Sequence, residues 1–196
     1  MAYLQNYPAP VAKTGQKKCY QRNGNRWVEH PCNDATPAKQ DGALRRGVAL
    51  PNPRFTDNEN GTVTDNLTGL IWLKNANAFG TKNWQGALDA ANTLASGQHK
   101  LSDGSTAGQW RLPNVRELCS LIDYGYHDPA LCNTEGTEKW TNGNPFNDVQ
   151  PNRYWSSSTN SYYAADGWYV NLSNGFVYTN SKKSLINYVW PVRGGQ

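Results

Sequence analysis

Hydrophobic and polar residues alternate most regularly between residues 168 and 180, which read WYVNLSNGFVYTN. An Asn-Gly pair inside such a pattern is a strong hairpin signal, because both residues of a tight turn need positive φ. The sequence therefore predicts two antiparallel strands joined by a two-residue loop at Asn174-Gly175. The predicted cross-strand pairs are Ser173–Phe176, Leu172–Val177, Asn171–Tyr178 and Tyr169–Asn180.

This register sorts the hairpin residues into two faces, because successive side chains of a strand point to opposite sides. The face predicted to join the core contains Trp168, Val170, Leu172, Val177 and Thr179. The face predicted to bind a ligand contains Tyr169, Asn171, Ser173, Phe176, Tyr178 and Asn180. Tyrosine offers a large, stiff contact area, and serine and asparagine offer adaptable hydrogen bonds. The alternative is an ordinary solvated sheet face.

The segments around this hairpin have a similar composition, and six of the eleven tyrosines lie within the last 43 residues. The predicted binding surface therefore extends beyond the two strands. The further candidate residues are Tyr154, Asn160, Tyr162, Tyr163, Asp166, Lys182, Asn187, Tyr188 and Trp190.

Two stretches show the 3.6-residue period of amphipathic helices. The first begins after Asn83, which is a suitable N-cap, and stops before Gly97. The second begins after Asn114, and Glu117 three residues later completes a capping box. Both helices are predicted to cover a sheet.

Short strands are predicted on either side of Asn60-Gly61, at residues 54–56 and 62–65, and in the apolar run 70–73. Residues 188–193 read as a closing strand. Since Pro191 cannot donate a ladder hydrogen bond, this strand must lie at a sheet edge or be interrupted. The predicted class is α+β, with two helices packed on short antiparallel strands and hairpins.

Residues 1–53 are predicted to form an N-terminal appendage, because prolines interrupt them and no helical period survives. Residues 54–196 form the predicted ligand-binding domain. Within the appendage, residues 21–28 are expected to be a small hairpin that turns at Asn23-Gly24.

The four cysteines allow three pairings. The two local pairings, Cys19–Cys32 and Cys119–Cys132, are the most economical, and paired cysteines indicate an oxidising compartment. No Cys-x-x-Cys occurs and the three histidines lack metal-ligand spacing, so no metal and no cofactor are predicted. The acidic turn 57–65 has oxygen ligands for calcium but lacks EF-hand spacing, which favours a plain turn.

The net charge of +4 is modest. Basic doublets occur at Lys17-Lys18, Arg45-Arg46 and Lys182-Lys183. No nucleic-acid motif accompanies it, so nucleic-acid binding is not expected. No apolar run approaches membrane-spanning length, so no membrane insertion is expected. The N-terminal residues show no signal peptide. The expected location is nevertheless extracellular, on a bacterial cell surface or a phage particle.

Several motifs occur in a recognisable order: Gly61-Thr62-Val63-Thr64-Asp65, Thr68-Gly69-Leu70-Ile71-Trp72, Trp110-Arg111-Leu112-Pro113-Asn114, Tyr154-Trp155-Ser156-Ser157-Ser158 and Pro191-Val192-Arg193-Gly194-Gly195. This chain resembles, from about residue 55 to residue 196, the Lcl C-terminal domain family, named after a collagen-like adhesin. The resemblance implies a C-type-lectin-like fold, distantly related to the formylglycine-generating enzyme.

The tail is also similar to that of the variable proteins of diversity-generating retroelements, in which selected codons near the C-terminus are mutated. The resemblance implies that residues 159–188 contain diversified positions. Trp190 stands where an arginine is expected in the family, which makes it either a ligand contact or a neutral change.

These observations favour a non-enzymatic recognition module that binds a protein or glycan on another cell or particle, and an oligomer is compatible with them. One alternative is a sulfated-glycan adhesin that uses the basic doublets. Another is an oxidoreductase like the formylglycine-generating enzyme, which would need reactive cysteines beside a groove. No catalytic residue is predicted, because no nucleophile motif organises the Ser, His and Asp residues present.

Overall fold

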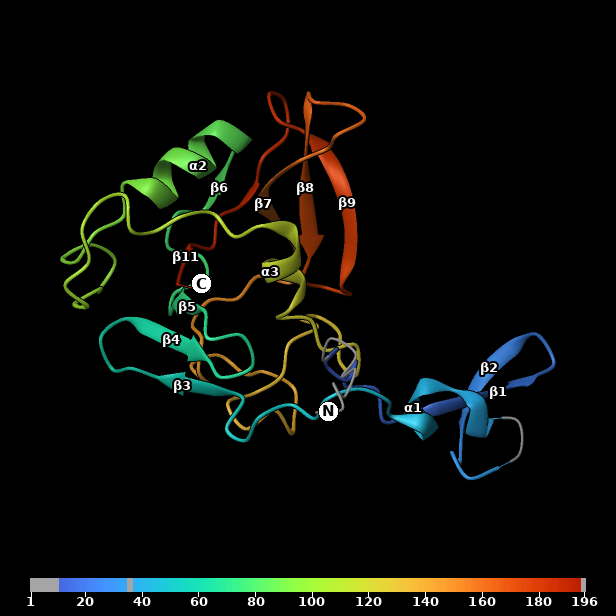
Figure 1. Cartoon of the computed structure of the whole chain (residues 1–196). Coiled ribbons are helices and arrows are strands. Elements are labelled where there is room, and N and C mark those ends of the chain that lie inside the picture. Colours follow the sequence, from blue (N-terminus) through green and yellow to red (C-terminus); the bar gives the residue numbers. More distant parts are fainter. Residues whose placement is uncertain (1–10, 35–36, 195–196) are drawn as a thin grey trace, which may run out of the picture. The chain divides into compact units, whose positions relative to one another are not determined.

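A computed structural model describes residues 11–34 and 37–194. The chain divides into two compact units, Met1–Leu50 and Pro51–Gln196 (Figure 1). We call them the N-terminal unit and the C-terminal unit and describe each by itself. Within the described ranges, no helix is both long and apolar enough to cross a bilayer.

The N-terminal unit is built on an antiparallel hairpin of β1 (Cys19–Asn23) and β2 (Arg26–His30). The loop is Gly24-Asn25 rather than the predicted Asn23-Gly24, because Asn23 pairs with Arg26. Gly24 supplies the positive φ, 60°, at the first loop position. The predicted disulfide between Cys19 and Cys32 closes the base of the hairpin. A short 3-10 turn, η1 (Pro37–Lys39), and α1 (Asp41–Leu44) follow.

The C-terminal unit contains two sheets and confirms the α+β class. One sheet has the order β11-β5-β4-β3 and consists of β3 (Phe55–Asp57), β4 (Thr62–Asp65), β5 (Ile71–Leu73) and β11 (Val192–Arg193). The other has the order β6-β10-β7-β8-β9 and consists of β6 (Thr81–Lys82), β7 (Arg153–Thr159), β8 (Asp166–Asn171), β9 (Phe176–Ser181) and β10 (Asn187–Tyr188). Neighbouring strands pair antiparallel, except that β10 pairs with β7 in parallel.

Both predicted helix starts are confirmed. Asn83 caps α2 (Trp84–Asn92) by accepting a hydrogen bond from the Gly86 backbone N–H. Asn114 and Glu117 form the predicted capping box of α3 (Val115–Cys119). Both helices are shorter than the apolar stripes predict. The apolar residues that follow them, such as Leu94 and Leu121, are buried but belong to loops.

The β8–β9 hairpin forms, but its predicted loop is two residues too short. Asn171 pairs with Phe176 and Tyr169 with Tyr178, so the loop runs from Leu172 to Gly175. The backbone of Leu172 is engaged elsewhere, because its carbonyl accepts from the Ala130 N–H and its N–H donates to the Asn152 carbonyl. The shift of two residues keeps the paired residues of β8 and β9 in the same two groups.

The core between the sheets contains aromatic side chains from distant parts of the chain. The Trp190 ring lies 5.4 Å from Trp72, 4.9 Å from Phe146 and 5.5 Å from Tyr154, measured between centroids. Its Nε1 donates to the Leu73 carbonyl. The predicted closing strand is interrupted at Pro191, as expected, so that β10 and β11 join different sheets.

The prediction of a second disulfide is wrong, because Cys119 and Cys132 are free thiols in this structure. The two thiols have different surroundings. Cys132 is buried, and the charges of Arg54, Asp123 and Asp65 act on it, whereas the charge that acts on Cys119 is that of Arg116. Cys119 and Cys132 have the same sequence separation as Cys19 and Cys32, but only Cys19 and Cys32 are bonded.

The carboxylates of Asp57 and Asp65, in the acidic turn 57–65, have basic partners. Asp57 pairs with Lys74, and the buried Asp65 pairs with Arg54 at 3.0 Å while also accepting from Thr68. The two carboxylates therefore point to different basic side chains, Lys74 and Arg54.

Candidate functional site

Five of the residues predicted to contact a ligand are buried, which corrects the sequence-based assignment. They are Tyr154, Tyr169, Asn180, Asn187 and Trp190. Tyr154 and Trp190 belong to the aromatic core described above, so Trp190 is a packing residue. Burial also raises the pKa of the Tyr154 hydroxyl, which accepts a hydrogen bond from the Gln150 backbone N–H.

Tyr169 is buried because α2 covers its face of the sheet. It packs with Trp155 and with Ala87 and Ala91 of the helix, and only 5% of its surface is exposed. Gly167, two residues earlier on the same face, leaves room for the Trp84 indole, since a Cβ there would lie 2.7 Å from that ring. The predicted ligand-binding face is therefore a core face along β8.

Asn180 and Asn187 form a buried polar contact. The Asn180 Nδ2 donates to the Asn187 Oδ1 at 3.2 Å. The hydrogen bond compensates part of the cost of removing two amides from water. This pair is a structural element of the sheet rather than a surface that a ligand reaches.

Two aromatic residues of the same face remain exposed on β9, which lies at the edge of its sheet. Phe176 and Tyr178 point outward, and the exposed fraction of Tyr178 is 59%. Their ring centroids lie 5.7 Å apart with planes inclined by 31°. Such a pair offers a rigid apolar surface with one hydroxyl, the type of surface that is enriched at recognition sites.

The loop before β8 adds two more exposed tyrosines. Tyr162 is 96% exposed and Tyr163 is also exposed, although the loop itself is ordered by backbone hydrogen bonds. The Asn160 N–H donates to the Asp166 carbonyl, and the Asn160 Oδ1 accepts from the Tyr162 N–H. A fixed loop loses little conformational entropy when its tyrosines bind. We name Tyr162, Tyr163, Phe176 and Tyr178 the exposed aromatic set.

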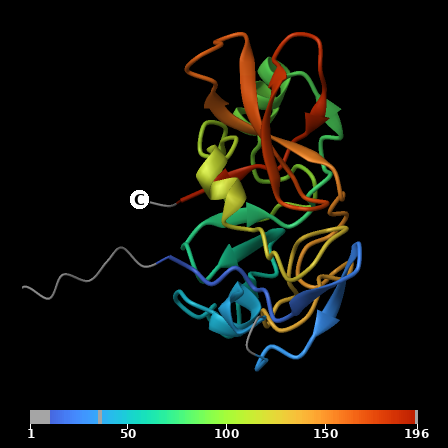
Figure 2. The same cartoon turned by 90° about the vertical axis from the view of Figure 1, so that its right-hand side faces the viewer.

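Lys182 ties this loop to the rest of the unit. Its Nζ donates to the Thr159 hydroxyl at 2.7 Å and to the Ala164 carbonyl at 3.0 Å, and lies 4.1 Å from the Trp84 ring centre. Both views show the loop before β8 and the loop after β9 at the same end of the sheet (Figures 1 and 2). Lys182 therefore holds the loop that carries Tyr162 and Tyr163 beside Trp84 of α2.

The remaining predicted residues are partly buried and have internal partners. Ser173 donates to Asp128 at 2.5 Å, and its N–H donates to the Asn171 Oδ1. The Tyr188 ring packs 5.4 Å from Tyr154. Asp166 accepts from the Thr179 hydroxyl at 3.2 Å. These groups are therefore engaged by partners within the C-terminal unit.

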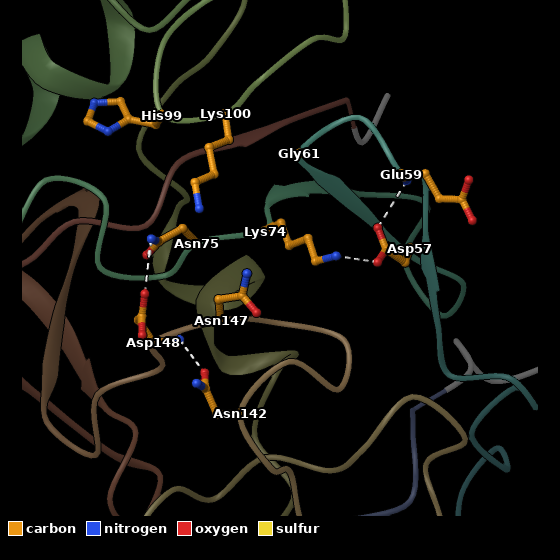
Figure 3. A pocket seen from close by; sticks show the side chains of 10 residues that line it. All are labelled: Asp57, Glu59, Gly61, Lys74, Asn75, His99, Lys100, Asn142, Asn147 and Asp148. Carbon is orange, nitrogen blue, oxygen red and sulfur yellow. Dashed lines mark hydrogen bonds and ion pairs between the residues drawn. The ribbon is translucent and has the colours of Figure 1, made fainter.

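A second candidate, missed from the sequence, is a polar hollow of about 550 Å³ in the C-terminal unit (Figure 3). It is lined by Asp57, Glu59, Gly61, Lys74, Asn75, His99, Lys100, Asn142, Asn147 and Asp148. Lys74 pairs with Asp57, and Asn75 donates to Asp148 at 3.1 Å. Its mixed charges and amides suit a small polar or zwitterionic molecule rather than an apolar one.

The backbone around this hollow is unusual. Glu59, His99, Lys100 and Asp148 all have φ between 47° and 64°, in the left-handed region that residues other than glycine adopt only in a few per cent of cases. Such conformations often gather at functional sites. No sequence signal predicted all four, since Glu and Lys are not typical of left-handed positions.

The free thiols do not have the environment of reactive cysteines. Burial raises the pKa of Cys132 to about 12 and also raises the pKa of the half-buried Cys119. Reactive cysteines instead have pKa values lowered by nearby cations or helix N-termini. Both groups are therefore protonated thiols at neutral pH.

Comparison with known proteins adds one finding. Residues 61–193 match the family described as the Lcl C-terminal domain. The chain belongs to the Lcl C-terminal domain family. The range matched to the Lcl family includes the exposed aromatic set and lies entirely within the C-terminal unit. No curated protein and no solved structure matches the chain significantly.

Proposed function

We propose that the C-terminal unit is a recognition module that binds a protein or glycan on another cell or particle through the exposed aromatic set. The observation that carries this proposal is the separation of roles along one hairpin. Tyr169 and Asn180 hold the fold, while Phe176 and Tyr178 are exposed on the neighbouring edge positions. Exposed aromatic residues on a rigid support are typical anchors of recognition surfaces.

The fold proposed for this unit is C-type-lectin-like, and the proposed location is extracellular. The Cys19–Cys32 disulfide supports an oxidising compartment. The sequence resemblance to variable proteins of diversity-generating retroelements agrees with the four exposed aromatic residues, whose replacement would leave the core intact. Sequencing the flanking DNA tests this point, since a reverse transcriptase gene and a near-copy of the codons for residues 159–188 are expected there.

Binding is favoured over catalysis. The alternative of an enzyme like the formylglycine-generating enzyme needs a reactive thiolate, and the raised pKa values of Cys119 and Cys132 work against one. The alternative of a sulfated-glycan adhesin needs accessible basic groups, whereas Lys182 of the third doublet is already engaged by Thr159 and Ala164.

The test compares binding of the labelled full chain to panels of cells and immobilised glycans. Replacing Tyr162, Tyr163 and Tyr178 by Ser is expected to weaken binding. An anchor residue contributes about 2 kcal/mol, which corresponds to roughly 30-fold in Kd. Tyr20→Ser, an exposed tyrosine of the N-terminal unit, is the matched control. Unchanged binding by the triple variant refutes the proposal, and binding that disappears at raised salt supports the sulfated-glycan alternative instead.

A further inference from the structure

The positive charge of the chain is concentrated in the N-terminal unit. Residues 1–50 contain eight lysines and arginines and three aspartates and glutamates, a net charge of +5, whereas residues 51–196 carry −1. The basic residues are Lys13, Lys17, Lys18, Arg22, Arg26, Lys39, Arg45 and Arg46. A small unit with this charge is complementary to an anionic surface.

The same unit exposes apolar side chains beside these charges. Trp27 is 67% exposed, and the register of the hairpin places it directly opposite Arg22 on one face. Tyr20 lies on that face too, diagonally across the hairpin, and is also exposed. Val28, the next residue of β2, is exposed on the other face. The hairpin therefore presents apolar area on both sides near its turn.

The base of the hairpin is held firmly while its tip extends. The Cys19–Cys32 disulfide closes the base. The Gln40 side chain donates to the Tyr20 carbonyl and accepts from the Tyr20 N–H, so it occupies the free edge of β1 as a strand would. Gly42 allows α1 to approach β1, because a Cβ there would lie 2.0 Å from the Lys18 carbonyl oxygen. These contacts hold β1, with which β2 and its Trp27 pair along the whole hairpin.

Trp and Arg next to each other suit one environment especially well. An indole ring is favourable at the level of lipid headgroups, where one part is apolar and the N–H remains hydrated. An arginine stem lies along apolar surface while its guanidinium reaches a phosphate. Arg22 lies opposite Trp27 across the hairpin, and Arg26, the residue before Trp27, lies on the other face with Val28.

From this arrangement we infer that the N-terminal unit is a peripheral docking module for anionic phospholipid surfaces. Trp27 and Val28 enter the headgroup region, and Arg22 and Arg26 contact lipid phosphates. The chain lies on the bilayer and does not span it. An acidic polysaccharide would use the same basic groups, but it has no use for the exposed aliphatic residues Val28, Leu44 and Val48. This inference is independent of the function proposed for the C-terminal unit.

The experiment measures co-sedimentation of the full chain, with its disulfide intact, with vesicles of phosphatidylglycerol mixed into phosphatidylcholine. Binding to these vesicles and much weaker binding to pure phosphatidylcholine are expected, and raised salt should weaken it. Trp27→Ser and the double variant Arg22→Glu, Arg26→Glu should each lower apparent affinity by about tenfold or more. Tyr178→Ser, which removes an exposed aromatic residue of the other unit, should bind like the unaltered chain.

Three outcomes would overturn the inference. The first is no sedimentation of the unaltered chain with phosphatidylglycerol vesicles, including the case in which it binds dextran sulfate instead. The second is vesicle binding that Trp27→Ser leaves unchanged, which indicates attraction by charge alone. The third is a lower melting temperature for Trp27→Ser, which indicates that this side chain is covered by its own chain.

Discussion

Tyr169 and Tyr178 are direct cross-strand partners on one face of one hairpin, yet they have opposite environments. Tyr169 is 5% exposed and Tyr178 is 59% exposed. The difference comes from α2, which covers the face of the inner strands β7 and β8 through Ala87 and Ala91. Strand register decides which residues share a face, and the covering helix decides which of them a ligand can reach.

Replacing each of these tyrosines by alanine should give the largest difference in the free energy of unfolding. Tyr169→Ala is expected to lower the free energy of unfolding by about 3–5 kcal/mol, because it leaves a cavity among Trp155, Ala87 and Ala91. Tyr178→Ala should change it by only about 0.5 kcal/mol. Urea denaturation of both variants checks this, with Tyr169→Phe as a control that keeps the ring. Equal losses for both positions would contradict the assignment of Tyr178 to the surface.

Gly167→Ala should disturb the packing of α2 on β8. The new Cβ would lie 2.7 Å from the Trp84 Cδ1 and 2.8 Å from its Nε1, so the indole must move. Overpacking of this kind costs about 1–3 kcal/mol. The hydrogen bond from the Trp84 Nε1 to the Ser156 carbonyl should weaken as well, and indole N–H exchange measured by NMR reports it. A variant as stable as the unaltered chain, with an unshifted Trp84 signal, would mean that the helix does not press on β8.

Glu117 gives a smaller effect that depends on pH. Partial burial acts against its charge, but Arg111 and the Asn114 N–H outweigh burial and hold the pKa of Glu117 below its ordinary value. A lowered folded-state pKa stabilises the fold above the unfolded-state value, about 4.3, and the contribution is lost as pH falls through the folded-state pKa.

Glu117→Gln should therefore cost about 1 kcal/mol at neutral pH, and the difference from the unaltered chain should shrink in acid. Denaturation at several pH values measures it. Because a glutamine can still accept from the Asn114 N–H, the difference reports the charge of Glu117 and its pair with Arg111 rather than the capping box. A difference between the two proteins that is constant with pH would exclude the ionised carboxylate as its source.

Chemical modification of the two free thiols, Cys119 and Cys132, is the smallest effect and reports how deeply each is buried. Alkylation of the native, unreduced chain at mildly alkaline pH should modify Cys119 slowly and Cys132 more slowly still, because burial raises both pKa values and Cys132 is more deeply buried. Peptide mapping should find one link, Cys19–Cys32. A link between Cys119 and Cys132 would restore the sequence-based pairing.

Local signals in the sequence predicted local structure well. The caps at Asn83 and Asn114 are confirmed because a side chain satisfies neighbouring backbone groups whatever surrounds it. The grouping of the β8 and β9 residues into two faces is correct because alternation survives a shift of two residues, but the face predicted to bind a ligand is buried along β8. The pattern of one hairpin could not show that α2 lies over Tyr169, since that contact joins residues far apart in sequence. For the same reason the polar hollow was missed.

The position of Trp190 has a consequence for synthesis of the chain on the ribosome. This residue completes an aromatic core with Trp72, Phe146 and Tyr154, and Val192 pairs with Trp72 across β5 and β11. Until these late residues leave the exit tunnel, Trp72 lacks the Trp190 ring and β5, although β4 is already available, lacks β11 on its other side. The C-terminal unit is therefore expected to complete folding only after almost its whole sequence has been translated, with its nascent apolar surfaces exposed to chaperones until then.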